Sequence, residues 1–298
     1  MSIDEAIRLK AFEWLKEQQA IHGDVLPREL LERGFEFEGE RIPVIAPQGI
    51  FKPRYLELPL SITTAPKGPY NDSHSNDGYL LYKYRGTDPL HRDNVGLRQA
   101  MIRNTPLIYF YGLVPGRYLA TFPVYIVGDD SASLTFKVAV DDVGVESLQG
   151  QSLVREGADG RRTYITTVVR QRLHQRSFRE RVIRAYHDQC ALCRLRHHEL
   201  LDAAHIIPDI EPKGLPSVRN GISLCKFHHA AFDAHILGIT PEYAIQIRGD
   251  VLKEEDGPML QHALQELHGA RIVLPRDKNS WPDKEALDIR YQRFKLAS

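Results

Sequence analysis

The sequence predicts an α+β protein with two domains, a β-rich domain over residues 1–145 and a second, mixed domain over 166–298. The chain of 298 residues is long for one domain and sufficient for two separate cores. Runs of aromatic and β-branched residues, separated by turn signals, concentrate between 35 and 140. The stretch 146–165 is polar and contains glycine and serine, so it predicts a linker.

The first domain begins with helical periodicity and then changes to strands. Apolar residues at helical spacing predict two helices between residues 7 and 33, with Pro27 in a first helical turn. The remaining segments predict a curved, mostly antiparallel sheet with one short helix. In chain order we expect a hairpin at Glu38-Gly39, strands over 54–62 and 78–84, a helix capped by Asp93 or Asn94, two long strands joined at 114–116, and a strand over 134–142.

The second domain begins with a helix over 168–189 that leads directly to Cys190. Its other segments alternate between short apolar runs and helical periodicity. We expect a strand over 200–207, a helix over 226–237, a strand within 239–252, a helix over 257–269, a short strand over 270–275 and a closing helix.

The composition is that of an ordinary globular protein, with 42% hydrophobic and 26% charged residues and a formal net charge of +0. No apolar run reaches the roughly 20 residues that a membrane span needs. The first residues contain acids and no apolar signal region, so we expect a cytoplasmic protein without a membrane partner. The charge is uneven, because eight arginines and a single acid lie between 161 and 184.

Three cysteines in such a chain argue for free thiols or a metal rather than a disulfide framework. Cys190 and Cys193 form a C-x-x-C pair, and Cys225 and His228 form a second pair of the same span. Two short chelating pairs from distant segments supply the four N/S ligands of a tetrahedral structural zinc site. The spacing therefore predicts Zn²⁺ bound by every cysteine of the chain and one histidine.

The adjacent His228 and His229 are predicted to serve two different purposes. On a helix, His229 and Asp233 stand four residues apart and share one face. His228 faces another direction, so it is able to bind zinc while its neighbour belongs to a second site.

The segment "DAAHIIP…NGISLCKFHHAAFD", preceded by the C-x-x-C pair, resembles the HNH endonucleases, the ββα-metal family. The likeness covers roughly 175–240, and the motif positions are His205, Asn220 and His229. It implies a phosphodiesterase. His205 would be the general base that takes a proton from water, Asn220 would orient the strand of that histidine, and His229 would bind a divalent cation, Mg²⁺ or Mn²⁺.

The catalytic metal shell departs from the family in one place. Many members have an acid or histidine directly before the base, and this chain has Ala204. Asp233 suits an oxygen ligand for the cation. Asp202 is a further candidate, although alternation along the strand would place it on the face opposite His205. On the preceding basic helix, Arg176, Arg179 and Arg184 are candidate contacts to DNA phosphates.

A β-rich domain followed by an HNH unit resembles modification-dependent (type IV) restriction endonucleases. The resemblance rests on this layout and on the strand pair "PLIYF…GRY…PVYIV", and it implies a reader of the SRA or PUA-like class at the N-terminus. The two helices between 7 and 33 are equally compatible with a winged-helix reader. No base-binding residue follows from either alternative.

The leading hypothesis is a metal-dependent endonuclease that cuts double-stranded DNA, directed to modified DNA by residues 1–145. A homing or phage-type HNH nuclease acting on unmodified DNA is the second hypothesis. A zinc-stabilised DNA-binding regulator without catalysis, in which His205 and His229 are packing residues, is the third. A nuclease with one site per chain is expected to act as a homodimer when it cuts both strands.

Overall fold

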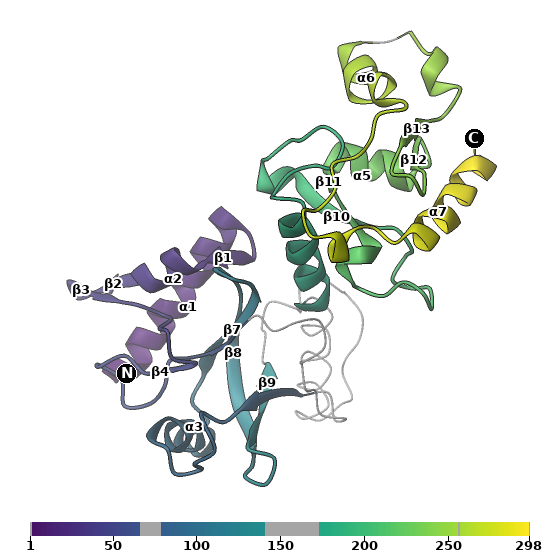
Figure 1. The fold of residues 1–298 in the computed structure, drawn as a ribbon. Helices are drawn as coiled ribbons and strands as arrows, with labels where there is room; N and C mark the ends of the chain where they lie inside the picture. Colours follow the sequence, from purple (N-terminus) through teal and green to yellow (C-terminus); the bar gives the residue numbers. More distant parts are fainter. Residues whose placement is uncertain (1, 66–78, 141–172, 256, 298) are drawn as a thin grey trace, which may run out of the picture. The chain divides into compact units, whose positions relative to one another are not determined.

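The structure is a computed structural model that describes residues 2–65, 79–140, 173–255 and 257–297. It divides into two units, Met1–Leu173 and His174–Ser298, and each is described by itself (Figure 1). The predicted linker, 146–165, lies outside the described residues. Within the described ranges no helix is long and apolar enough to cross a membrane.

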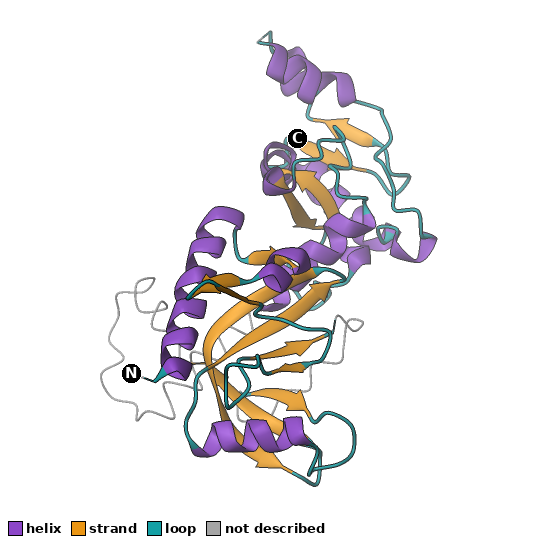
Figure 2. Ribbon diagram, turned by 90° about the vertical axis from the view of Figure 1, so that its left-hand side faces the viewer, coloured by secondary structure: helices purple, strands orange, loops and turns teal. Residues whose placement is uncertain are grey.

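A strongly bent sheet forms the centre of the first unit (Figure 2). The strand order is β4-β5-β7-β8-β9-β6, and β1 also pairs with β8. The pairs are antiparallel except β5 with β7, so the prediction of a mostly antiparallel sheet is confirmed. The strands are β1 (Val25–Pro27), β4 (Ile50–Phe51), β5 (Ser61–Thr64), β6 (Leu80–Lys83), β7 (Leu107–Val114), β8 (Arg117–Asp130) and β9 (Thr135–Val140).

Among the described residues of this unit, three helices and a separate hairpin accompany the sheet. They are α1 (Ile3–His22), α2 (Arg28–Arg33), α3 (Arg92–Ile102) and the pair β2 (Phe35–Phe37) and β3 (Glu40–Ile42). The predicted hairpin turn is confirmed: Glu38 and Gly39 both have positive φ, which a two-residue type I′ turn requires.

The predicted cap of α3 is wrong. His91 is the N-cap residue, and its Nδ1 accepts a hydrogen bond from the Asp93 amide. Asn94 is instead buried inside the first turn. Its amide nitrogen donates to the carbonyls of Arg85 and Asp88, so this side chain fastens the preceding loop to the helix.

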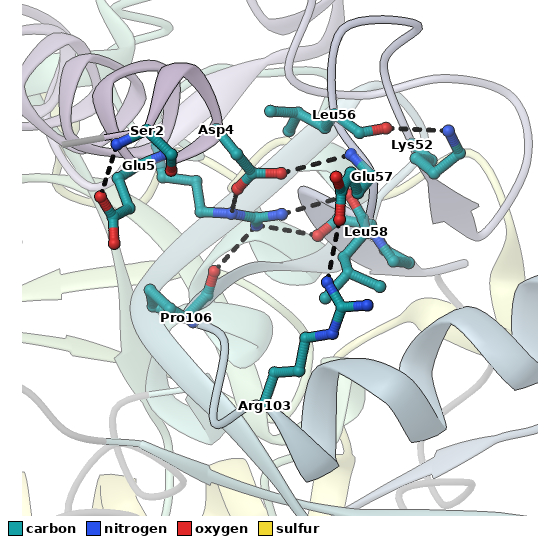
Figure 3. Close-up of polar contacts among 11 residues, drawn as sticks. Ser2, Asp4, Glu5, Lys52, Leu56, Glu57, Leu58, Arg103 and Pro106 are labelled. Carbon is teal, nitrogen blue, oxygen red and sulfur yellow. Dashed lines mark hydrogen bonds and ion pairs between the residues drawn. The ribbon is translucent and has the colours of Figure 1, made fainter.

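Two strand predictions in this unit also need correction. The segment β1 was expected to be part of a helical region, yet it pairs with β8. The expected strand over 54–62 instead turns at 54–55 and bends at 57–58, and it joins the sheet only at Ser61. A buried arginine holds this segment in place of a strand ladder: Arg8 of α1 donates to the carbonyls of Leu58, Pro59 and Pro106 at 2.8–3.2 Å (Figure 3).

The second unit contains the predicted HNH region. A helix described over 174–185 leads to the hairpin of β10 (Leu201–His205) and β11 (Gly221–Cys225), which is followed by α5 (Lys226–Asp233). The remaining elements are β12 (Leu237–Ile239), β13 (Ile245–Ile247), α6 (Pro258–Ala263) and α7 (Lys284–Ala297), with 3₁₀ turns at His198–Leu200, Val218–Asn220, Val251–Lys253, Gln265–Leu267 and Lys278–Ser280.

The end of the chain differs from expectation in two places. The helix expected over 257–269 is split, because α6 ends at Ala263 and a 3₁₀ turn follows. The strand expected over 270–275 makes a single bridge, from Arg271 to Ala244. The closing helix is confirmed as α7, and it packs against β12 where Gly238 leaves room for the ring of Phe294.

Candidate functional site

A β-hairpin followed by one helix carries the three HNH motif residues of the second unit. In the β10–β11 register, Leu201 pairs with Cys225 and His205 pairs with Gly221. The length of the hairpin therefore separates Cys225 from His205. Cys225 and the helix start lie at one end, and His205 lies at the other.

Cys190, Cys193, Cys225 and His228 lie together at the first end. Their four ligand atoms all lie within 4.8 Å of one another. The His228 Nδ1 lies 3.4 Å from the sulfur of Cys190 and 3.2 Å from that of Cys225. The sulfurs of Cys193 and Cys225 are 4.0 Å apart. Tetrahedral zinc with Zn–S of about 2.3 Å and Zn–N of about 2.0 Å implies separations of roughly 3.5–3.8 Å, so the set could hold a metal such as zinc.

The surroundings of this cluster favour a cation. Burial lowers the pKa of His228, but hydrogen bonds with Cys190 and Cys225 outweigh it and raise the pKa to about 10. Hydrogen bonding among the three thiols lowers the pKa of Cys225 and raises that of Cys193, so these groups share protons that a bound metal would displace. The Nε2 of His228 lies 2.7 Å from the Ala263 carbonyl, a hydrogen bond that directs Nδ1 to the metal position.

His205, the last residue of β10, is half-buried beneath an aromatic ring. Its imidazole stacks on Phe178 of the preceding helix, with ring centroids 4.0 Å apart and planes at 15°. Burial lowers the pKa of His205 below its usual value, although the charges of Asp209, Asp202 and Asp233 oppose this. A neutral imidazole at neutral pH is the form that accepts a proton.

Gly221 makes the stacking of Phe178 on His205 sterically feasible. A Cβ at this position would lie 2.5 Å from Val182 Cγ2 and 2.8 Å from Phe178 Cζ. The helix therefore packs directly on the backbone of β11, opposite His205.

Asn220 is buried directly before β11, and its side chain binds the backbone just after His205. Its Oδ1 accepts from the Ile207 amide, and its Nδ2 donates to the carbonyls of Ile207 and Leu215, at 2.9–3.0 Å. The Ile206 amide donates to the Asn220 carbonyl. These bonds fix the exit of β10, which is the geometry expected of a residue that orients the His205 strand.

His229 lies between two carboxylates. Its Nδ1 is 3.2 Å from Asp202 Oδ2, and its Nε2 is 3.3 Å from Asp233 Oδ2. The hydrogen bond with Asp202 is the main cause that raises the pKa of His229. Burial would raise the pKa of Asp202, but the hydrogen bond from His229, together with the nearby amide and charges, lowers it.

This donor set could hold a hard divalent cation. If Nδ1–H of His229 donates a hydrogen bond to Asp202, Nε2 carries a lone pair on the side of Asp233. This is the carboxylate–histidine–metal arrangement. His229 and Asp233 would then hold Mg²⁺ or Mn²⁺ with water. The geometry thus favours an orienting role for Asp202 over the direct ligation expected from the sequence, and its charge still acts on His205.

The three candidate DNA-binding arginines have different surroundings. Arg179 is largely enclosed by the protein: it pairs with Glu180, donates to the carbonyls of His198 and Leu201, and has Nε 3.6 Å from Asp202. This geometry favours a structural role for it. Arg176 is half-buried and Arg184 is exposed on the same helix.

Sequence reasoning did not find three residues that shape the site. Phe178 looks like any other member of an apolar stripe, and Gly221 like a residue of a turn. Arg290 of α7 is remote in sequence, yet it contacts Asp233. No local signal in the sequence marks Arg290, because its partner lies 57 residues earlier.

Comparison with known proteins agrees with the HNH prediction. Residues 190–240 match the model of the HNH endonuclease family, a range that contains His205, Asn220, His229 and the Cys/His cluster. No curated protein matches the chain.

Two solved structures are similar to this chain at low TM-scores. One is the modification-dependent TagI restriction endonuclease, with 14% identity and a TM-score of 0.30, covering 79% of this chain and 81% of that chain. The other is the type IV phosphorothioation-dependent restriction endonuclease ScoMcrA, with 16% identity and a TM-score of 0.21, covering 57% and 45%.

Proposed function

We propose that this chain is a metal-dependent DNA endonuclease of the HNH type. The observation that carries the proposal is the arrangement on one hairpin and helix: His205 stacked on Phe178, Asn220 bound to the backbone after it, and His229 between two carboxylates. The family match over 190–240 supports the same reaction class.

The chain's own residues account for the proton transfer and the positioning. A ring nitrogen of His205 takes a proton from water while the water oxygen forms a bond to phosphorus, and the bond to the leaving oxygen breaks. Phe178 fixes the imidazole plane, and Asn220 fixes its backbone. A divalent cation at His229 and Asp233 would supply positive charge for the developing charge on the phosphate.

Zinc at Cys190, Cys193, Cys225 and His228 would be structural. The four positions are filled by protein ligands, which is the closed arrangement of a structural site. It would tie the turn at 190–193 to the start of α5, the helix that carries His229.

We propose further that the first unit selects the DNA, with modified bases as the class of ligand. All three HNH motif residues belong to the second unit, while the first has its own bent sheet and cores. This arrangement matches enzymes in which one domain recognises the DNA and another domain cleaves it.

The test is cleavage of plasmid DNA by the purified protein with Mg²⁺ or Mn²⁺, beside His205→Ala. The wild type should cut, and His205→Ala should lose about 10²–10⁴-fold in rate, the usual contribution of a general base. Equal inactivity of both proteins on modified and unmodified DNA with every metal would refute the nuclease. A panel of DNAs with defined base modifications decides the reader: equal cutting of all members would support the unmodified-DNA alternative.

A further inference from the structure

A buried arginine from the end of the chain contacts the candidate cation site. Arg290 lies on α7, and its guanidinium reaches the last turn of α5. One nitrogen, Nη2, lies 3.0 Å from the Phe232 carbonyl and 3.2 Å from Asp233 Oδ1. The guanidinium also stacks on the Phe232 ring, with Cζ 4.6 Å from the centroid.

The two oxygens of Asp233 have different partners. Oδ2 lies 3.3 Å from His229 Nε2, and Oδ1 lies 3.2 Å from Arg290. The Asp233 side chain is 60% exposed, whereas that of Arg290 is 10% exposed. An exposed carboxylate on a short helix would otherwise sample several rotamers, so the buried guanidinium holds it in one orientation.

Burying the charged side chain of Arg290 lowers the free energy of unfolding. A charged side chain in the interior loses hydration, and its Nε finds no hydrogen-bond partner within the described part of the chain. The contacts that it does make converge on the end of α5, at the backbone of Phe232 and the carboxylate of Asp233. Arg290 therefore orients the Asp233 carboxylate as well as packing on α5.

We propose that Arg290 is a positioning residue for the divalent cation: it fixes Asp233 so that Oδ2 faces the position that His229 Nε2 also faces. The inference rests on the proposed function, since it concerns the cation of that site. Residues that orient metal ligands typically contribute about 10–100-fold to metal affinity. An arginine suits the task better than a lysine, because its planar group stacks on Phe232 while it donates to Asp233.

The chain offers a matched control on the same helix. Arg293 lies three residues after Arg290 and makes a bidentate pair with Glu211, with both N–O distances 2.7 Å. Arg293→Gln therefore removes a paired cation of α7 without touching His229 or Asp233.

The experiment compares Arg290→Gln, Arg290→Lys and Arg293→Gln in the full chain loaded with zinc. Mn²⁺ binding is measured by the loss of the free Mn²⁺ paramagnetic resonance signal, and cleavage is measured across Mn²⁺ concentrations. Arg290→Gln should bind Mn²⁺ about 10–100-fold more weakly, require correspondingly more Mn²⁺ for cleavage, and retain its zinc. Arg293→Gln should behave as the wild type.

Wild-type Mn²⁺ affinity in Arg290→Gln would overturn the inference. If Arg290→Gln fails to retain zinc, Arg290→Lys decides in the same way, with weakened Mn²⁺ binding expected. Asp233→Asn combined with the arginine variant gives a second check, because the losses should not add if both act through one carboxylate. A wild type that neither binds Mn²⁺ nor cuts DNA would instead refute the proposed function itself.

Discussion

His205 owes its chemistry to the residues around it. Phe178 covers one face of the imidazole, and burial lowers its pKa against the opposing charges of three aspartates. Asn220 holds the backbone beyond it. These contacts suit His205 to the role of proton acceptor that we propose for it.

The pH dependence of cleavage follows from this lowered pKa. A base works only when it is unprotonated, and a pKa below the usual value keeps His205 neutral as the pH falls through about 6.5. At saturating Mg²⁺ we expect the acidic limb of kcat/KM to have its midpoint below pH 6.5. A midpoint at or above that value would contradict the burial effect. The metal must be saturating at each pH, because protons compete with it for His229, whose pKa is raised.

The arginines of the basic helix should separate into two functions. Arg184 is exposed, so Arg184→Gln should weaken DNA binding about uniformly across sequences and reduce the salt slope by about 1. Arg179→Gln should instead lower the melting temperature, because it removes the donor to the carbonyls of His198 and Leu201. Anisotropy titrations at several salt concentrations measure the first effect. Isotherms for Arg184→Gln that coincide with the wild type at every salt concentration would remove it from the DNA interface.

At the residue level the sequence revealed the groups whose type and spacing encode their chemistry. The cysteine pairs and the doublet of His228 and His229 belong to this class. Burial and distant partners are not encoded in spacing. The enclosed position of Arg179 and the reach of Arg290 to Asp233 therefore appeared only in three dimensions.

The β10–β11 hairpin is the element that separates the Cys/His cluster from His205. Its register places Cys225 opposite Leu201 at one end and Gly221 opposite His205 at the other. The packing of the preceding helix on Gly221 joins the hairpin to Phe178.

Gly221→Ala tests the close packing of this element. The new methyl group would lie 2.5 Å from Val182 and 2.8 Å from Phe178, so the helix or the hairpin must shift. We expect a loss of about 1–3 kcal/mol in the free energy of unfolding, as for overpacked cores, and a reduced rate of cleavage. Gly249→Ala is the control, since nothing lies within 4 Å of its added carbon. Equal denaturation midpoints for the two variants would contradict the packing described.

Helices and strands with clear patterns in their own sequence were predicted well. Segments whose conformation depends on contacts with distant residues were not. The strands β7 and β8 and their turn have long aromatic and branched runs. By contrast, the segment 54–60 forms turns and bends rather than a strand, and Arg8 donates to the carbonyls of Leu58 and Pro59. The run 270–275 has strand-like composition but a single bridge as partner. The composition of a segment indicates its propensity to form a strand, but it does not show whether a neighbouring strand is available to pair with it.

On the scale of the whole molecule, the two units have separate cores and one tryptophan each. Trp14 packs against the core of the first unit, and Trp281 packs against that of the second. Both tryptophans of the chain are thus reporters of different units. Zinc at the Cys/His cluster would stabilise only the second, because binding to a structural site is folding free energy.

Zinc removal should therefore unfold the chain in part. In Trp14→Phe, a strong chelator should shift the emission of Trp281 toward that of an exposed indole. In Trp281→Phe, the emission of Trp14 should stay that of the folded unit. Equal shifts in the two variants would contradict the independence of the cores.

The central claim is that His228 and His229, adjacent in sequence, belong to different metal sites. The most direct test is the zinc-to-protein ratio of purified His229→Ala, measured beside its cleavage of DNA with Mg²⁺. We predict the zinc content of the wild type together with loss of cleavage. Loss of the zinc, or cleavage at the wild-type rate, would contradict this division of roles.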